Sequence, residues 1–169
     1  MKKIICDKLV RITKNRKNLE KKLNVKITNR GKEVSINGKP EEEYTAEKVI
    51  DALNFGFPFS VAMLISEQDF TFEILNIKDY TKRHDLDRVR ARIIGKKGKT
   101  LSTLNQLTHC NFELKDNKVG IIGNAEHIAN AQQAVISIIQ GSKQTNVYSF
   151  LEKHQVKPVE DLGLKNTKE

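Results

Sequence analysis

Residues 93–101 of the 169-residue chain read Ile-Ile-Gly-Lys-Lys-Gly-Lys-Thr-Leu, and no other stretch indicates the fold as clearly. Two glycines separated by two lysines interrupt an apolar periodicity, which indicates a tight loop between two helices. Neither glycine has a side chain that would obstruct the close approach of a phosphate backbone. The next helix begins here, so its free N–H groups and the lysines favour anions. The stretch therefore predicts a loop that clamps nucleic acid.

The segments on either side of this loop predict a small α+β unit. Alternating apolar residues indicate strands, and apolar residues at helical spacing indicate helices. Asp85 and Asn124 are suited to cap helices, and Gly141 is placed to end one. In chain order we expect a strand over 70–80, a helix over 85–94, the loop, a helix over 99–109, strands over 111–114 and 118–122, and a helix over 124–139.

The N-terminal third of the chain repeats this pattern. Ile12 and Leu19 have the same spacing as Ile94 and Leu101, and residues 36–53 match residues 121–138 at a constant offset. We therefore expect a duplicated unit, each copy with strand, helix, loop, helix, strand, strand and helix. In the first copy, Thr-Lys-Asn-Arg over 13–16 stands where the glycine loop would be, so close backbone approach is not expected there.

The repeat suggests the domain boundaries. We expect a first domain over 1–54, an apolar inter-domain segment over 55–69, a second domain over 70–141, a C-terminal helix over 142–154 and a flexible tail over 155–169. The inter-domain segment is rich in phenylalanine, unlike a flexible linker, so we expect it to pack between the domains. A peptide-binding groove is the alternative interpretation of this segment.

The chain carries 30 Lys and Arg residues against 21 Asp and Glu, a net charge of +9, and the positive charge is confined to two blocks. Residues 1–39 hold 13 basic and 3 acidic residues, 40–80 hold 2 and 9, 81–99 hold 8 and 2, and 100–169 hold 7 of each. Clustered Lys and Arg release counterions from nucleic acid, so we expect a polyanionic partner. A membrane-surface helix would need a bulky apolar face, which the second block lacks.

Other function classes find little support in the sequence. Gly-Lys-Thr over 98–100 ends like a nucleotide hydrolase loop, but that motif needs a glycine at position 93, which is Ile. Four histidines, at positions 84, 109, 127 and 154, lack metal-ligand spacing, and no nucleophile–His–Asp set is readable. We therefore expect no enzyme activity, no metal and no cofactor.

The expected compartment is the reducing cytoplasm. Cys6 and Cys110 are far apart in the sequence, which argues against a disulfide framework and a cysteine-built zinc site. No run of eighteen apolar residues is present, so no membrane span is expected. The first six residues lack the long apolar run of a signal peptide.

Several stretches together resemble a known family. They are Phe72-Glu73-Ile74, the run from Arg92 to Thr100, Val119-Gly120-Ile121-Ile122-Gly123, Ala134-Val135, Ile139-Gln140-Gly141-Ser142 and Val147-Tyr148. Over roughly residues 1–154 the chain resembles tandem KH proteins of the Dim-Two/Partner-of-Nob-One family in its short archaeal form. The resemblance implies two tandem type I KH domains, each βααββα with a three-stranded sheet and helices on one face.

The resemblance also implies a function. Members are non-catalytic assembly factors of the small ribosomal subunit, which bind single-stranded rRNA near its 3′ end. They cooperate with the PIN-domain endonuclease Nob-One, which matures that end. The rivals are a KH adaptor in RNA decay or translation and a protein-binding scaffold.

The expected RNA-binding residues follow from the loop and its neighbours. The family's loop carries over to Gly95, Lys96, Lys97 and Gly98. Around it we expect contacts from Ile94, Leu101, Lys99, Thr100, Arg88, Arg90 and Arg92, the first two in an apolar groove for bases and the arginines along a phosphate track. In the first copy, Lys14, Arg16 and Lys17 are candidates for auxiliary contacts.

Overall fold

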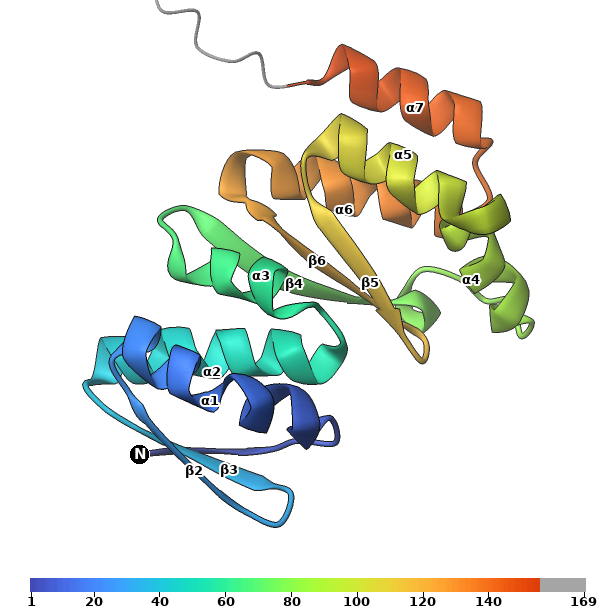
Figure 1. Ribbon diagram of the computed structural model, residues 1–169. Helices are drawn as coiled ribbons and strands as arrows, with labels where there is room; N and C mark the ends of the chain where they lie inside the picture. The colour runs from blue at the N-terminus through green and yellow to red at the C-terminus, as the bar shows by residue number, and fades with distance from the viewer. Residues whose placement is uncertain (156–169) are drawn as a thin grey trace, which may run out of the picture.

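The computed structural model describes residues 1–155 and shows an α+β protein (Figure 1). The first half contains β1 (Lys2–Ile5), α1 (Leu9–Leu23), β2 (Lys26–Arg30), β3 (Glu33–Asn37), α2 (Pro40–Phe55) and α3 (Phe59–Ala62). The second half contains β4 (Phe70–Asn76), α4 (Leu86–Ile94), α5 (Lys99–Thr108), β5 (Asn111–Lys115), β6 (Lys118–Asn124), α6 (Ala125–Ile139) and α7 (Gln144–Lys153). Short 3-10 turns lie at Met63–Ser66, Ile77–Asp79 and Lys96–Gly98.

Two three-stranded antiparallel sheets form the frame, with strand orders β1-β3-β2 and β4-β6-β5. In both sheets the last strand of the three lies in the middle. Figure 1 shows alternating layers: the first sheet, then α1 and α2, then the second sheet, then α5, α6 and α7. The predicted α+β class with three-stranded sheets is therefore confirmed.

The first half departs from the predicted helix–loop–helix. A single helix, α1, runs without a break from Leu9 to Leu23, through the segment 13–16 where a loop is expected. That segment contains no glycine or proline to end a helix. Ile12, Leu19 and Leu23 share the buried side of the helix, which keeps it packed on the sheet along its length. From β1 to α2 the first half is therefore β-α-β-β-α, followed by the short helix α3, and the predicted βααββα order holds only in the second half, from β4 to α6.

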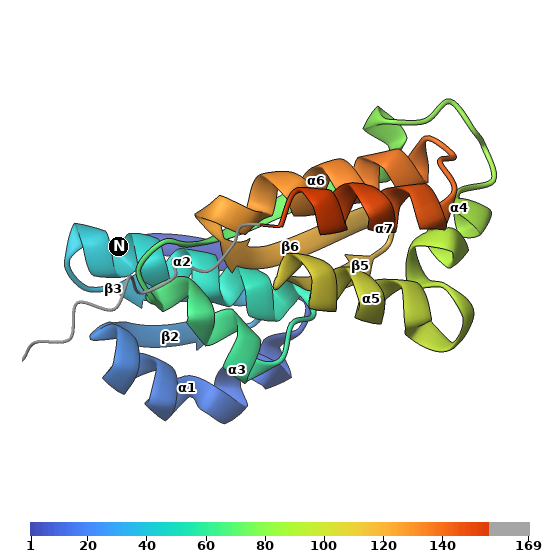
Figure 2. The same ribbon diagram turned by 90° about the horizontal axis from the view of Figure 1, so that it is seen from above.

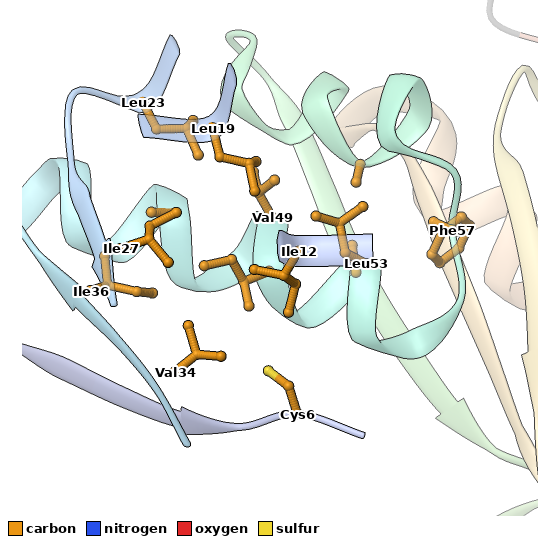
Figure 3. Close-up of a cluster of buried hydrophobic side chains, with 14 of the residues drawn as sticks. Cys6, Ile12, Leu19, Leu23, Ile27, Val34, Ile36, Val49, Leu53 and Phe57 are labelled. Atoms are coloured by element: carbon orange, nitrogen blue, oxygen red, sulfur yellow. The ribbon is translucent and has the colours of Figure 1, made fainter. Parts of the chain in front are cut away.

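Each sheet has its own apolar core. The first core gathers Cys6, Ile12, Ile36 and Leu53 between the first sheet and helices α1 and α2 (Figure 3). Neighbouring residues of a strand point to opposite faces, so β6 contributes to both cores. Ile121 belongs to the second core, whereas Ile122 belongs to the first. The second sheet is therefore covered on both faces.

Three aromatic rings fill the contact between the halves. The ring centroids of Phe55, Phe57 and Phe72 lie 5.7–6.0 Å from one another. The rings of Phe55 and Phe57 pack over Gly120 of β6, where an added Cβ would lie 2.7 Å from the Phe55 ring and 2.9 Å from the Phe57 ring. A residue without a side chain is needed here because the rings occupy that space.

Two polar residues hold the start of α1 against the end of α2 within the first half. The Arg11 guanidinium donates hydrogen bonds to the carbonyl oxygens of Gly56 and Phe57, just beyond the end of α2. In return, the Asn54 side-chain oxygen accepts from the backbone N–H groups of Asp7 and Lys8 at 2.8 and 3.1 Å. The start of α1 and the end of α2 therefore satisfy each other's free backbone groups.

The predicted tail over 155–169 lies outside the described residues apart from its first residue. Among the residues described, none of the helices has the length and apolar character needed to cross a membrane.

Both cysteine thiols are expected to be inert in the folded protein. Cys6 and Cys110 are fully buried, and burial is the main reason that the pKa of each thiol is raised to about 11. Because the thiolate is the reactive form, neither should react with a disulfide reagent at about pH 8. Both should react once guanidinium chloride unfolds the chain. Fast labelling of the folded protein would contradict this burial.

Candidate nucleic-acid interface

The loop Gly95–Gly98 lies between α4 and α5 in a conformation that requires its glycines. Gly95 has φ +76° and ψ 173°, a region that glycine adopts almost alone. An added Cβ there would lie 2.1 Å from the Thr100 Oγ1 atom, so sterics also exclude a side chain. At Gly98 (φ +74°) nothing lies within 4 Å of such a Cβ. The first glycine therefore fits the protein tightly, and the second faces open space.

The lysines of the loop are free to meet a ligand. Lys96, Lys97 and Lys99 are exposed, and no ion pair in the described residues involves them. Lys97 itself has φ +54° and ψ 31°, the left-handed conformation that costs a non-glycine residue about 1–2 kcal/mol. Such strain persists where the surrounding structure imposes it, commonly at binding loops.

Two apolar side chains flank the loop. Ile94 is the last residue of α4 and is exposed, and Leu101 in the first turn of α5 is partly buried against the second core. They lie on either side of the loop in sequence, one on each helix that borders it. This arrangement offers apolar surface to bases whose phosphates contact the loop.

The structure does not support a continuous track of arginines. Residues two apart on a helix point about 200° apart, so Arg90 lies on the opposite side of α4 from Arg88 and Arg92, which are four residues apart and share a face. Arg90 donates to the Asp116 carbonyl oxygen at 3.0 Å and pairs with Asp87. Arg92 donates to two backbone carbonyl oxygens, at 3.2 and 2.7 Å. Arg88 alone is left exposed, with the nearest Asp85 oxygen 3.9 Å away.

Thr100 also differs from expectation. Its side chain is only 3% exposed, so it does not face a ligand outside. Its hydroxyl lies under Gly95 and accepts a hydrogen bond from the Gln144 side-chain amide at 3.1 Å. Thr100 is therefore part of the support of the loop, which is a correction to its predicted role in RNA contact. The bond to Gln144 joins residues 44 positions apart, so local sequence patterns carry no sign of it.

The basic residues of the first half lie on a helix, not on a loop. Lys14 and Lys17 are exposed and one turn apart on α1, whereas Arg16 is partly buried and pairs with Glu20 at 3.4 Å. The α1 helix and the loop Gly95–Gly98 lie in different parts of the molecule (Figures 1 and 2). The structure therefore keeps the two predicted groups of basic residues apart.

The described residues contain no cluster of three or more His, Cys, Asp or Glu side chains able to hold a metal ion. His109 and His127 come nearest to a pair, with ring centroids 5.6 Å apart. Within residues 1–155, Asp51 is the one carboxyl whose pKa is raised, chiefly by burial and secondarily by nearby Glu47. It lines a cavity of about 450 Å³ between α2 and β4, away from the loop.

Comparison with known proteins identifies the second half. Residues 71–156 match a family described as the eukaryotic type KH-domain (KH-domain type I). A KH domain-containing protein of Methanocaldococcus jannaschii is 28% identical over 149 residues, covering 84% of this chain and 66% of that protein. The pre-rRNA-processing protein PNO1 of Candida glabrata is 38% identical over 106 residues, covering 60% of this chain and 40% of that protein.

A solved structure shares the fold over most of the chain. It is the a/eIF2alpha–aDim2p–rRNA complex from Pyrococcus horikoshii, with a chain that is 27% identical and superposes with a TM-score of 0.82. The match covers 90% of this chain and 92% of that one. The matched part thus spans nearly the whole archaeal structure but only 40% of the fungal protein.

Proposed function

This chain belongs to the Dim2/PNO1 family of type I KH-domain proteins, and from that membership we propose that it is an RNA-binding assembly factor of the small ribosomal subunit. We propose further that it binds single-stranded rRNA near the 3′ end and assists maturation of that rRNA without catalysing a step itself. The observation that carries this proposal is the Gly-Lys-Lys-Gly loop, with its exposed lysines and glycine-only backbone.

In the proposed mechanism the loop Gly95–Gly98 clamps about four nucleotides of backbone, as in KH domains generally. Phosphates lie against the loop, where Lys96, Lys97 and Lys99 neutralise them. The α5 helix has ten residues, and the free N–H groups of its first turn point toward the phosphates at this loop. Ile94 and Leu101 contact the bases, and Arg88 extends the contact to a further phosphate. Arg90, Arg92 and Thr100 act within the protein.

We propose that the first half is a KH domain that has lost its loop. The shared strand order supports this, because the last strand lies in the middle of both sheets. Its lysines on α1 then make auxiliary contacts to phosphates, without the clamp. In this proposal the protein acts in the cytoplasm on the pre-small subunit. The endonuclease Nob-One is its protein partner.

Two other functions are kept as alternatives. A KH adaptor in RNA decay or translation would use the same loop on a different RNA. A protein-binding scaffold is favoured by one observation, the continuous helix α1 in place of a loop in the first half. The adaptor differs from the main proposal in the RNA sequence that it prefers. The scaffold differs in that the loop need not bind RNA.

The proposal predicts preference for the 3′-terminal rRNA sequence. A labelled RNA of that sequence should bind at least about tenfold more tightly than a scrambled RNA of equal length, because bases read in the groove add discrimination to the phosphate contacts. Fluorescence anisotropy at constant salt measures both. The same sequence annealed to its complement serves as control and should bind more weakly, since its bases are paired. Equal affinity for target and scrambled RNA would point to the adaptor instead.

A further inference from the structure

The loop Gly95–Gly98 is supported from behind by one side chain of α7. The Gln144 Nε2 atom lies 3.1 Å from the Thr100 Oγ1 atom and 3.3 Å from the carbonyl oxygen of Arg92. Arg92 is in the last turn of α4, where carbonyl groups have no partner within the helix. Thr100 is in the first turn of α5. A single amide group therefore joins the two helices that border the loop.

The bonded Thr100 hydroxyl lies directly under the loop. An added Cβ at Gly95 would be 2.1 Å from this oxygen, so the backbone of the loop rests on it. Any movement of Thr100 would therefore shift Gly95. Because Thr100 is 3% exposed, solvent cannot replace the hydrogen bond from Gln144 if that bond is lost.

Gln144 is itself held in place. It is the first residue of α7, whose Val147 and Leu151 side chains are buried in the second core. The Arg92 guanidinium donates to the carbonyl oxygens of Ile138 and Ser142, which fixes the turn between α6 and α7. In Figure 2, α6 and α7 run side by side and the turn lies beside α4.

We infer that Gln144 is a positioning residue for RNA binding, which sets the spacing of α4 and α5 so that the loop is pre-organised before RNA arrives. This inference rests on the proposed function. A loop already in its bound shape loses less conformational freedom when it binds, so affinity rises without an added contact. Gln144 acts through Thr100 and Gly95 and does not touch RNA.

The test replaces the amide with an apolar side chain of similar length. Gln144→Met removes both hydrogen bonds of the amide, to Thr100 and to the Arg92 carbonyl oxygen, and should bind the 3′-terminal rRNA about fivefold more weakly. The slope of log affinity against log salt should not change, because every phosphate contact is kept. The amide hydrogens of Gly95 and Gly98, which donate to the carbonyl oxygens of Ala91 and Gly95, should exchange at least about fivefold faster in the RNA-free protein. Gln140→Met, an exposed glutamine nearby, is the control and should change none of these.

A second variant tests the route through Thr100. Thr100→Val removes only the bond between Thr100 and Gln144 and should weaken binding by the same amount or less, and the double variant should be no weaker than Gln144→Met alone, which already lacks that bond. Unchanged affinity and unchanged amide exchange in Gln144→Met would overturn the inference, as would additive losses in the double variant. The exchange measurement needs no RNA, so it separates failure of this inference from failure of the proposed function.

Discussion

Lys96→Asp/Lys97→Asp is expected to lower affinity for single-stranded rRNA by at least about two orders of magnitude, the largest effect we expect on binding. Each neutralised phosphate contributes about 0.7 to the salt slope, and the change replaces attraction by repulsion at the loop. Both side chains are exposed, and no ion pair in the described residues involves them, so the melting temperature should stay nearly the same. Anisotropy titrations at several salt concentrations, with circular dichroism for the fold, measure both quantities.

The matched control is Lys14→Asp/Lys17→Asp on α1, which makes the same change in formal charge. It should weaken binding much less, because these lysines lie on a helix without a glycine loop. Equal losses in the two double variants would mean that overall charge, and not the loop, determines binding. Unchanged affinity in the loop variant would remove the clamp and favour the protein scaffold.

The largest effect on stability is expected from Gly120→Leu. The substitution places a side chain where the rings of Phe55 and Phe57 lie within 3 Å of an added Cβ. Overpacking of a core commonly costs about 1–3 kcal/mol, and here the bulk enters the contact between both halves. We expect the free energy of unfolding to fall by about 3 kcal/mol or more. Urea denaturation followed by circular dichroism measures this loss.

Gly31→Leu provides the comparison for Gly120→Leu. Gly31 has φ +59° and nothing within 4 Å of an added Cβ, so its replacement costs only backbone strain, about 1–2 kcal/mol. Gly120 has no positive φ, so its replacement costs only steric clash. A loss at Gly120 no greater than that at Gly31 would show that the rings can move aside, contrary to the packing described.

The second half could be predicted from sequence because its signals are local. Two glycines in an apolar periodicity indicate a loop, and the structure has a helix break there with positive φ at both. In the first half the repeat alignment predicted a similar break, but residues 13–16 contain no glycine or proline. The helix preference of these residues determined the structure, and the alignment of the two sequence repeats predicted it less well.

The roles of Arg92 and Thr100 could not be read from sequence for a different reason. Arg92 bonds to carbonyl groups 46 and 50 positions away, and Thr100 bonds to a side chain 44 positions away. A basic residue beside a glycine loop has the same local appearance whether it faces solvent or the protein. Only the packing of α6 and α7 against α4 and α5 decides which groups remain outside.

The contact between the halves, where the rings of Phe55 and Phe57 pack against Phe72 and Lys115 donates to the Asn54 carbonyl oxygen, sets the separation between the loop Gly95–Gly98 and the lysines of α1. Two binding surfaces joined by a flexible linker can adjust their separation to the ligand. The linker then sets the effective concentration of the second surface once the first is bound. In the proposed function both surfaces contact one RNA, at the separation that the packing between the halves gives them. An RNA gains from touching both surfaces only when its own length between the two contacts matches that distance.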